Sequence, residues 1–173
     1  MQLLALSGSL RTGSINTALL RAAATLAAPT STVTLSDLPG KLPLFNPDLE
    51  TNPPPVVTGF RHQVAAADAL LIASPEYAHG ITGTMKNALD WLVSFEPFSG
   101  KRVAVINTSP RAHHADDALR EILRTMDADI VEAASITIPL VGAGLDNSAM
   151  LASPEIAAAI GRALDALQVR QGA

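Results

Sequence analysis

The chain alternates between short apolar runs and longer stretches in which apolar residues recur at helical spacing. Residues 3–6 form a run too short for a helix, and Ser7 and Gly8 end it at once. Residues 14–27 follow, with apolar side chains arranged as on one face of a helix. The pattern repeats, with further strands expected at 33–35, 69–73 and 103–106 and within 130–138, and helices at 57–67, 83–93, 115–126 and 154–168. Apolar strands separated by helices predict a parallel sheet that is covered by helices on both faces.

Size and composition fit one folded unit. With 173 residues, of which 48% are apolar and 16% charged, the chain can bury a sizeable core, and we expect a single domain over residues 1–173. The formal net charge is −4 and no basic block occurs, which argues against a nucleic-acid partner and against a polybasic membrane anchor. No run approaches the roughly 20 apolar residues of a membrane span.

Cysteine is absent from the sequence. This excludes disulfides, thiolate metal sites and cysteine catalysis, and it fits a reducing compartment. The first residues carry no positively charged segment, so we expect no signal peptide and a cytoplasmic protein. The histidines show no recognised metal-ligand spacing, and the adjacent His113 and His114 are expected to point apart. The sequence therefore predicts no metal site.

The turn after the first expected strand is a candidate ligand site, because parallel sheets of this class bind ligands beyond the carboxyl ends of their strands. It spans residues 7–16 and holds two glycines, four hydroxyl side chains and Arg11. Hydroxyls, an arginine and the unpaired N–H groups of a helix start all bind phosphate. Ser14 stands where a triphosphate-binding loop has lysine, and Leu10 breaks the glycine pattern of a dinucleotide fold. The turn predicts a monophosphate ligand, or else a Ser/Gly turn with Ser14 as N-cap and no ligand.

The turn after the third expected strand is a second candidate. Pro75 ends the strand, and Gly80 and Gly83 follow within a few residues. We expect these glycines to adopt backbone conformations that are closed to other residues. Backbone amides in such a turn can hydrogen-bond a flat polar ring.

Residues 39–55 interrupt the alternation of strands and helices. This stretch holds six of the twelve prolines, with Asn46-Pro47-Asp48 at its centre. Proline fixes φ and cannot continue a helix, so a long, stiff loop is predicted. Such a loop either covers the core or forms a wall of the binding site or a subunit contact.

Three motifs together resemble the NADPH-dependent FMN reductase family, which includes quinone, chromate and azo reductases. Residues 8–16 read GSLRTGSIN and match the family's motif G-S-L-R-x-G-S-x-N throughout. Residues 42–50 read LPLFNPDLE and differ from the family's L-P-L-Y-N-P-D-L-E only at Phe45. Residues 74–91 share with the family's second flavin motif its opening S-P-E-Y and the K-N-A and D-W that follow. The resemblance covers most of the chain.

The resemblance implies a flavodoxin-like, doubly wound α/β fold with a five-stranded parallel sheet of order 2-1-3-4-5 and helices on both faces. It also implies non-covalent FMN, with NADPH or NADH as electron donor, and no catalytic side chain, because the flavin carries the hydride chemistry. The phosphate would lie at residues 8–16, the ring would meet 75–78 mainly through backbone, and 109–111 would flank its other side. The residues expected to bind the cofactor are Ser9, Arg11, Ser14, Ile15, Asn16, Pro75, Glu76, Tyr77, Ala78, Ser109 and Arg111.

The activity implied by the resemblance is a two-electron, ping-pong transfer from NAD(P)H to a small-molecule acceptor of the quinone, azo, chromate or flavin type. Family members usually form homodimers or dimers of dimers, and we expect the same here. Two other functions stay open, namely a non-catalytic flavodoxin-like electron carrier and an FMN-binding regulatory protein.

Three departures from the family bear on the site. Ala78 replaces the usual asparagine, and Thr82 replaces the usual proline of the same turn. Residues 109–115 read SPRAHHA, where the family has a glycine-rich S-P-G-G-x-G-G. Side chains there would lower flavin affinity, reshape the pocket, or block flavin so that another ligand binds. Arg111 could meet the 2′-phosphate of NADPH, stabilise the negative charge of reduced flavin, or point into solvent.

Overall fold

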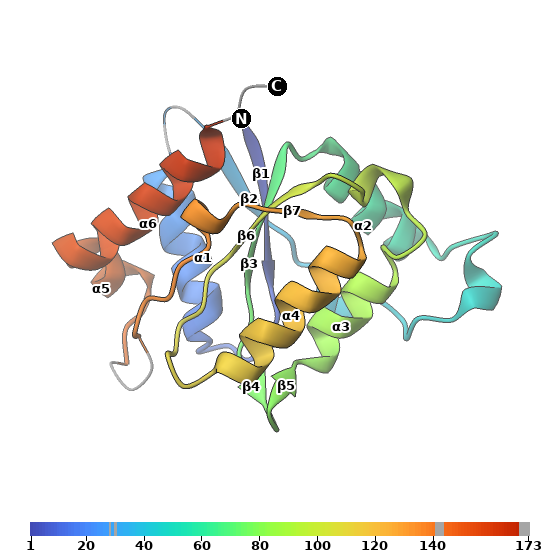
Figure 1. Cartoon of the computed structure of the whole chain (residues 1–173), viewed down its shortest axis with the longest axis horizontal. Coiled ribbons are helices and arrows are strands. Elements are labelled where there is room, and N and C mark those ends of the chain that lie inside the picture. The colour runs from blue at the N-terminus through green and yellow to red at the C-terminus, as the bar shows by residue number, and fades with distance from the viewer. Residues whose placement is uncertain (28, 30, 141–143, 170–173) are drawn as a thin grey trace.

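The computed structural model describes residues 1–27, 29, 31–140 and 144–169. Its centre is a five-stranded sheet in which every neighbouring pair of strands runs parallel (Figure 1). In spatial order the strands are β2 (Thr32–Leu35), β1 (Gln2–Ser7), β3 (Ala69–Ala73), β6 (Arg102–Val105) and β7 (Asp129–Ile130). The order 2-1-3-4-5 that was expected for a flavodoxin-like fold is confirmed.

Helices cover both faces of this sheet, as the apolar strands predicted. On one face lie α1 (Ile15–Leu26), α5 (Asn147–Ala152) and α6 (Pro154–Gln168), and on the other α2 (Pro55–Ala66), α3 (Gly83–Asp90) and α4 (His113–Thr125) (Figure 1). Successive side chains of β1 alternate between the two layers, with Leu3 and Ala5 in one core and Leu4 and Leu6 in the other. Among the described residues, no helix is both long and apolar enough to cross a membrane.

The helix boundaries follow the sequence signals closely where a capping residue is present. The hydroxyls of Ser14 and Ser153 cap α1 and α6, each by accepting a backbone N–H in the first turn of its helix. α4 begins at His113, earlier than the expected start at residue 115, and α3 ends at Asp90 rather than at residue 93. α5 was not expected.

The fifth strand, which was expected within residues 130–138, is the two-residue strand β7 at Asp129–Ile130. β7 pairs with β6 only over its two residues, and a short 3₁₀ helix, η4 (Glu132–Ala134), then leaves the sheet. The Ser135 hydroxyl replaces a strand carbonyl there, because it accepts the N–H of Val105 at 3.0 Å. A bridge at Thr137 restores strand-like pairing farther along. The pattern of apolar residues in the sequence could not predict this end of the strand, because it does not show when a side chain replaces a backbone hydrogen-bond partner.

A small antiparallel hairpin follows β3, and the sequence analysis did not predict it. Its parts are β4 (Glu76–Tyr77), the tip residues Ala78 and His79, and β5 (Gly80–Ile81). The tip residues have φ values of 50° and 59°, in the left-handed region. The expectation for Gly80 and Gly83 is wrong, since neither has a positive φ. The left-handed backbone falls on an alanine and a histidine, which carry a steric cost there.

The proline-rich segment 39–55 is held by side chains of α3 and of the turn after it. The Asn87 side chain accepts the N–H of Phe45 at 2.8 Å and donates to the carbonyl of Pro43 at 2.9 Å. The indole N–H of the buried Trp91 donates to the same carbonyl at 2.8 Å, and its ring meets the Phe45 ring edge-on. Asn87 and Trp91, from the K-N-A and D-W of the second motif, therefore hold the proline loop.

We expect Asn87→Ala to lower the free energy of unfolding by about 1–3 kcal/mol, because it leaves the N–H of Phe45 without its acceptor. Denaturant unfolding measures this loss, and limited proteolysis within residues 42–50 reports it locally. Lys86→Ala is the matched control, because it removes only a half-exposed ion pair with Asp90 on the same helix, worth about 0.5 kcal/mol or less. Equal losses in the two variants would show that Asn87 does not anchor the loop.

The carboxyl ends of β1 and β3 approach each other closely at Gly8. Its N–H donates to the carbonyl of Ala73 at 2.9 Å, and a Cβ at this position would lie 2.1 Å from Oγ of Ser74. A side chain at residue 8 would therefore push apart the turns that follow the two strands. Gly13, in the same turn as Gly8, is different, because a Cβ there would meet nothing within 4 Å.

Gly8→Ala should therefore destabilise the protein by about 1–3 kcal/mol through overpacking. Gly13→Ala should leave the stability unchanged or raise it slightly, because alanine restricts the unfolded chain. Thermal unfolding of the two variants, side by side, is the measurement. Adding Ser74→Gly to the Gly8 variant should restore part of the loss. Equal melting temperatures for the two alanine variants would contradict the close approach.

Candidate functional site

The loops after β1, β3 and β6 border a cavity of about 310 Å³ at the carboxyl edge of the sheet. β1 and β3 are neighbours, but the helices that follow them, α1 and α3, lie on opposite faces (Figure 1). The strand order reverses at this point. Open parallel sheets bind ligands in the crevice that such a reversal creates.

Six of the eleven residues expected to bind a cofactor line this cavity. They come from all three loops: Ile15, Asn16, Pro75, Glu76, Ser109 and Arg111. The other five lie in the same loops but outside the lining: Ser9, Arg11, Ser14, Tyr77 and Ala78. The cavity also has four lining residues that the sequence analysis missed: Ser74, Asn107, Thr108 and Ala112. Asn107 and Thr108 could have been found, because they are polar residues directly after a buried strand.

The loop between β1 and α1 presents free backbone donors. Within the part of the chain that the structure describes, five N–H groups of this loop find no acceptor: those of Leu10, Thr12, Gly13, Ile15 and Asn16. Ile15 and Asn16 open α1, so their N–H groups lie at the positive end of the helix dipole. Free backbone donors at a helix start fit a phosphate group.

Side-chain hydrogen bonds hold this loop in shape. The Ser7 hydroxyl contacts that of Thr17 at 2.7 Å and accepts the N–H of Ser9 at 3.2 Å. The Ser9 hydroxyl accepts the N–H of Arg11 at 3.4 Å, and the carbonyl of Arg11 accepts the N–H of Ser14 at 3.0 Å. The loop is therefore organised by its own residues, which lowers the entropy cost of binding a ligand.

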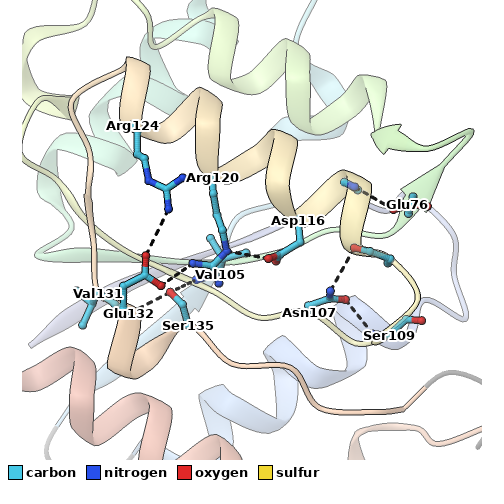
Figure 2. Close-up of polar contacts among 12 residues, drawn as sticks. Glu76, Val105, Asn107, Ser109, Asp116, Arg120, Arg124, Val131, Glu132 and Ser135 are labelled. Carbon is cyan, nitrogen blue, oxygen red and sulfur yellow. Dashed lines mark hydrogen bonds and ion pairs between the residues drawn. The ribbon is translucent and has the colours of Figure 1, made fainter.

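The hairpin that forms the second wall is attached to α4 through Glu76. Its Oε2 accepts the N–H of Ala115, in the first turn of α4, at 2.9 Å (Figure 2). A carboxylate at this position is favourable, because the start of a helix carries positive partial charge. The N–H groups of Ala78 and His79 at the tip have no acceptor among the described residues, and the Tyr77 side chain is 57% exposed. The hairpin thus offers backbone donors rather than the Glu76 carboxylate.

The loop after β6 is braced by the side chain of Asn107. Its Oδ1 accepts the N–H of Ser109 at 2.9 Å, and its Nδ2 donates to the carbonyl of Ala112 at 3.2 Å (Figure 2). The hydroxyl of Thr108 donates to Oδ1 of Asn16 at 3.2 Å, and both residues are buried. This hydrogen bond joins the third loop directly to the first.

Two arginines at this edge of the sheet have no acidic partner among the described residues, although the whole chain has a net charge of −4. Neither Arg11 nor Arg111 forms an ion pair within the described ranges. The carboxylates of Glu76 and Asp116 are engaged elsewhere, by the N–H of Ala115 and by Arg120. The site is therefore suited to an anionic ligand.

Arg120 ties α4 to η4 and so fixes the helix whose first turn borders the site. Its guanidinium contacts Asp116 and Glu132, each at 2.7 Å (Figure 2). Burial opposes the charge of Arg120, but hydrogen bonds and attraction from Asp116 and Glu132 outweigh it and raise the pKa of the guanidinium.

His113 and His114 do not point apart, so that expectation is wrong. Their ring centroids are 4.0 Å apart, and the His114 ring also lies 4.5 Å from that of His79 at the hairpin tip. The two residues open α4, where no preceding helical turn confines their side chains. Within the described residues, no group of three or more histidine, aspartate or glutamate side chains could hold a metal ion.

A larger cavity, of about 460 Å³, lies at the opposite edge of the sheet, by the amino ends of the strands. Asp68, Asp129 and Glu132 border it, and the guanidinium of Arg102 is engaged by carbonyls at the end of α6. Ligands of this fold class bind at the carboxyl edge. The smaller cavity, with its free backbone donors, is therefore the candidate site.

Comparison with known proteins agrees with this geometry. The model of the NADPH-dependent FMN reductase family matches residues 1–141. The chain is 36% identical over 175 aligned positions to the NAD(P)H-dependent FMN reductase PA1204 of Pseudomonas aeruginosa. The aligned region covers 98% of this chain and 94% of that protein. It is also 46% identical over 111 aligned positions to an NADPH:quinone oxidoreductase of Arabidopsis thaliana. That aligned region covers 60% of this chain and 56% of the relative.

Solved structures show the same architecture. FerB of Paracoccus denitrificans, a flavoenzyme NAD(P)H:(acceptor) oxidoreductase, matches with a TM-score of 0.75 at 25% identity, over 96% of this chain and 97% of that one. The azoreductase AzrA has a TM-score of 0.63 at 16% identity, over 96% of this chain and 99% of its own, and supports the fold alone. Because the family match spans most of the chain and includes the loops that border the cavity, this chain belongs to the NADPH-dependent FMN reductase family, whose oxidoreductases use FMN and NAD(P)H.

Proposed function

We propose that this chain holds FMN at the carboxyl edge of its sheet and reduces quinone- or flavin-type acceptors with NADPH or NADH. One observation carries the proposal. Five N–H groups in the loop between β1 and α1 have no acceptor among the described residues, and two of them belong to Ile15 and Asn16, which line a cavity of about 310 Å³ at the reversal of strand order. The donors fit a phosphate and the cavity fits part of a flat ring, and FMN has both.

In this proposal the FMN phosphate lies on the loop of residues 8–16. The N–H groups of Ile15 and Asn16 donate to it from the start of α1. The hydroxyls of Ser9 and Ser14 shape the loop, and each can also donate its own proton to a phosphate oxygen. Arg11 supplies the cation, since it is exposed and has no ion-pair partner among the described residues.

In the same proposal, the β4–β5 hairpin and the loop after β6 would hold the isoalloxazine ring between them. Pro75 lines one side, and the free N–H groups of Ala78 and His79 are donors for the polar edge of the ring. Ser109 and Arg111 line the other side. The braced loop and the fastened hairpin keep these groups in place before the cofactor binds.

FMN, when bound, supplies the two-electron chemistry between the nicotinamide coenzyme and the acceptor. The residues of the chain bind and orient the reactants, and the lack of cysteine leaves no thiol to take part. The motif resemblance also brings a ping-pong order into the proposal, in which the oxidised coenzyme leaves before the acceptor binds. Quinones are the first acceptors to test, because curated relatives from Arabidopsis thaliana and Pseudomonas putida are named quinone oxidoreductase or quinone reductase. Azo compounds and chromate stay within the proposal through the motif resemblance.

The proposal includes assembly as a homodimer or a dimer of dimers. Leu44 in the proline-rich segment is 84% exposed, and Val93 after α3 is 64% exposed. Apolar side chains this exposed support a contact with a second copy of the chain. A single domain and a cytoplasmic location, which the cysteine-free composition favours, are part of the same proposal.

Arg11→Ala should weaken FMN binding about 10- to 100-fold, because it removes a charge-assisted contact to the phosphate. Titration of the apoprotein with FMN gives the dissociation constant. Arg162→Ala, an equal change of charge on the exposed face of α6, is the control and should leave that constant unchanged. An unaltered affinity in the Arg11 variant would refute the placement of the phosphate.

Arg111→Gly should raise the KM for NADPH about 10-fold or more and leave the KM for NADH unchanged. Arg111 lines the cavity and has no ion pair within the described residues, so it can meet the 2′-phosphate. Steady-state coenzyme oxidation with a quinone acceptor measures both constants. A fall in the flavin reduction potential, with both coenzymes affected alike, would assign Arg111 to the reduced flavin instead. If the wild-type protein oxidised neither coenzyme, it would be an electron carrier or a regulator.

A further inference from the structure

The tip of the β4–β5 hairpin has a backbone that its residues do not favour. Ala78 and His79 lie side by side in the left-handed region, with φ of 50° and 59°. Two-residue hairpin tips of this kind favour asparagine and glycine, whereas other residues carry a steric cost. Such a conformation persists only where the surrounding structure holds it.

Ile81 of β5 packs against the apolar core that α4 shares, and two further side-chain contacts join the hairpin to the start of α4. From β4, Oε2 of Glu76 accepts the N–H of Ala115 at 2.9 Å (Figure 2). From the tip, the His79 ring lies 4.5 Å from the His114 ring, centroid to centroid, at an interplanar angle of 39°. The ring contact between His79 and His114 therefore involves His79, one of the two tip residues with left-handed backbone.

The ring contact also extends toward the other wall of the proposed flavin site. The His113 ring lies 4.0 Å from that of His114, and its Nδ1 is 3.2 Å from the carbonyl of Arg111. Arg111 itself lines the cavity. Three imidazole rings thus form a row from the hairpin tip to the loop after β6.

We propose that the His79–His114 ring contact is a latch that positions the hairpin tip for the flavin ring. Neither histidine acts on the substrate in this proposal. They act through the backbone of Ala78 and His79, whose N–H groups have no acceptor within the described chain. The effect on the cofactor rests on the proposed FMN site, whereas the contact itself can be tested without FMN.

His114→Ala should weaken FMN binding by the apoprotein about 3- to 10-fold, which is the size expected for the loss of an aromatic pair. His79→Ala should have the same effect, and the double variant should be no worse, because all three changes remove one contact. His114→Phe keeps a ring at this position and should bind FMN within about twofold of the wild type. His62→Ala, at an exposed histidine on α2, is the control.

Hydrogen exchange of the apoprotein tests the contact separately. Exchange over residues 76–81 should be faster in His114→Ala than in the wild type or in His114→Phe, with the melting temperature unchanged. Additive losses of affinity in the double variant, or unchanged exchange, would overturn the latch. Faster exchange with unchanged FMN affinity would overturn its positioning role. A wild-type protein that bound no FMN would defeat the proposed site, and the exchange data would still decide whether the ring contact holds the hairpin.

Discussion

The parallel pairing of β1 with β3 is the constraint on which the site depends. Their register sets Ser7 beside Ala73, and one residue farther on Gly8 leaves no room for a side chain against Ser74. After β1 the chain continues into α1 on one face of the sheet, and after β3 it continues into α3 on the other face. Each helix packs against the apolar core of its own face. The crevice between the two departures follows from strand order and requires no particular lining residue.

Polar side chains stabilise the walls of this crevice mainly by bonding to one another and to backbone. Asn107 holds both ends of its own loop, and Thr108 joins that loop to Asn16. Glu76 is engaged by α4 in the same way. With these side chains occupied, the groups that remain available within the described residues include backbone N–H donors without an acceptor and arginines without an ion pair. A ligand that is anionic at one end and polar along the edge of a flat ring satisfies this set.

Short apolar runs and helical spacing predicted the sheet and its helices well, because both depend on periodicity along the chain. The N-cap at Ser14, which the sequence analysis offered only with a ligand-free turn, is present, and it could be found from the sequence because capping involves only the next turn. The predictions failed where the deciding neighbour is distant in sequence. The Ser135 hydroxyl interrupts the fifth strand by accepting the N–H of Val105, and the left-handed backbone falls on Ala78 and His79, held against α4, rather than on the nearby glycines.

The sequence alone determined the fold class and, through its motifs, the family, and it singled out the loop that is proposed to hold a phosphate. These properties depend on residue order and on contacts within a few positions, which a sequence displays directly. Only the tertiary structure decided what several motif residues do: Asn87 and Trp91 hold the proline loop, and Glu76 caps α4. Those roles arise from hydrogen bonds between segments far apart in the chain. Such bonds exist only once packing has brought the segments within about 3 Å of each other.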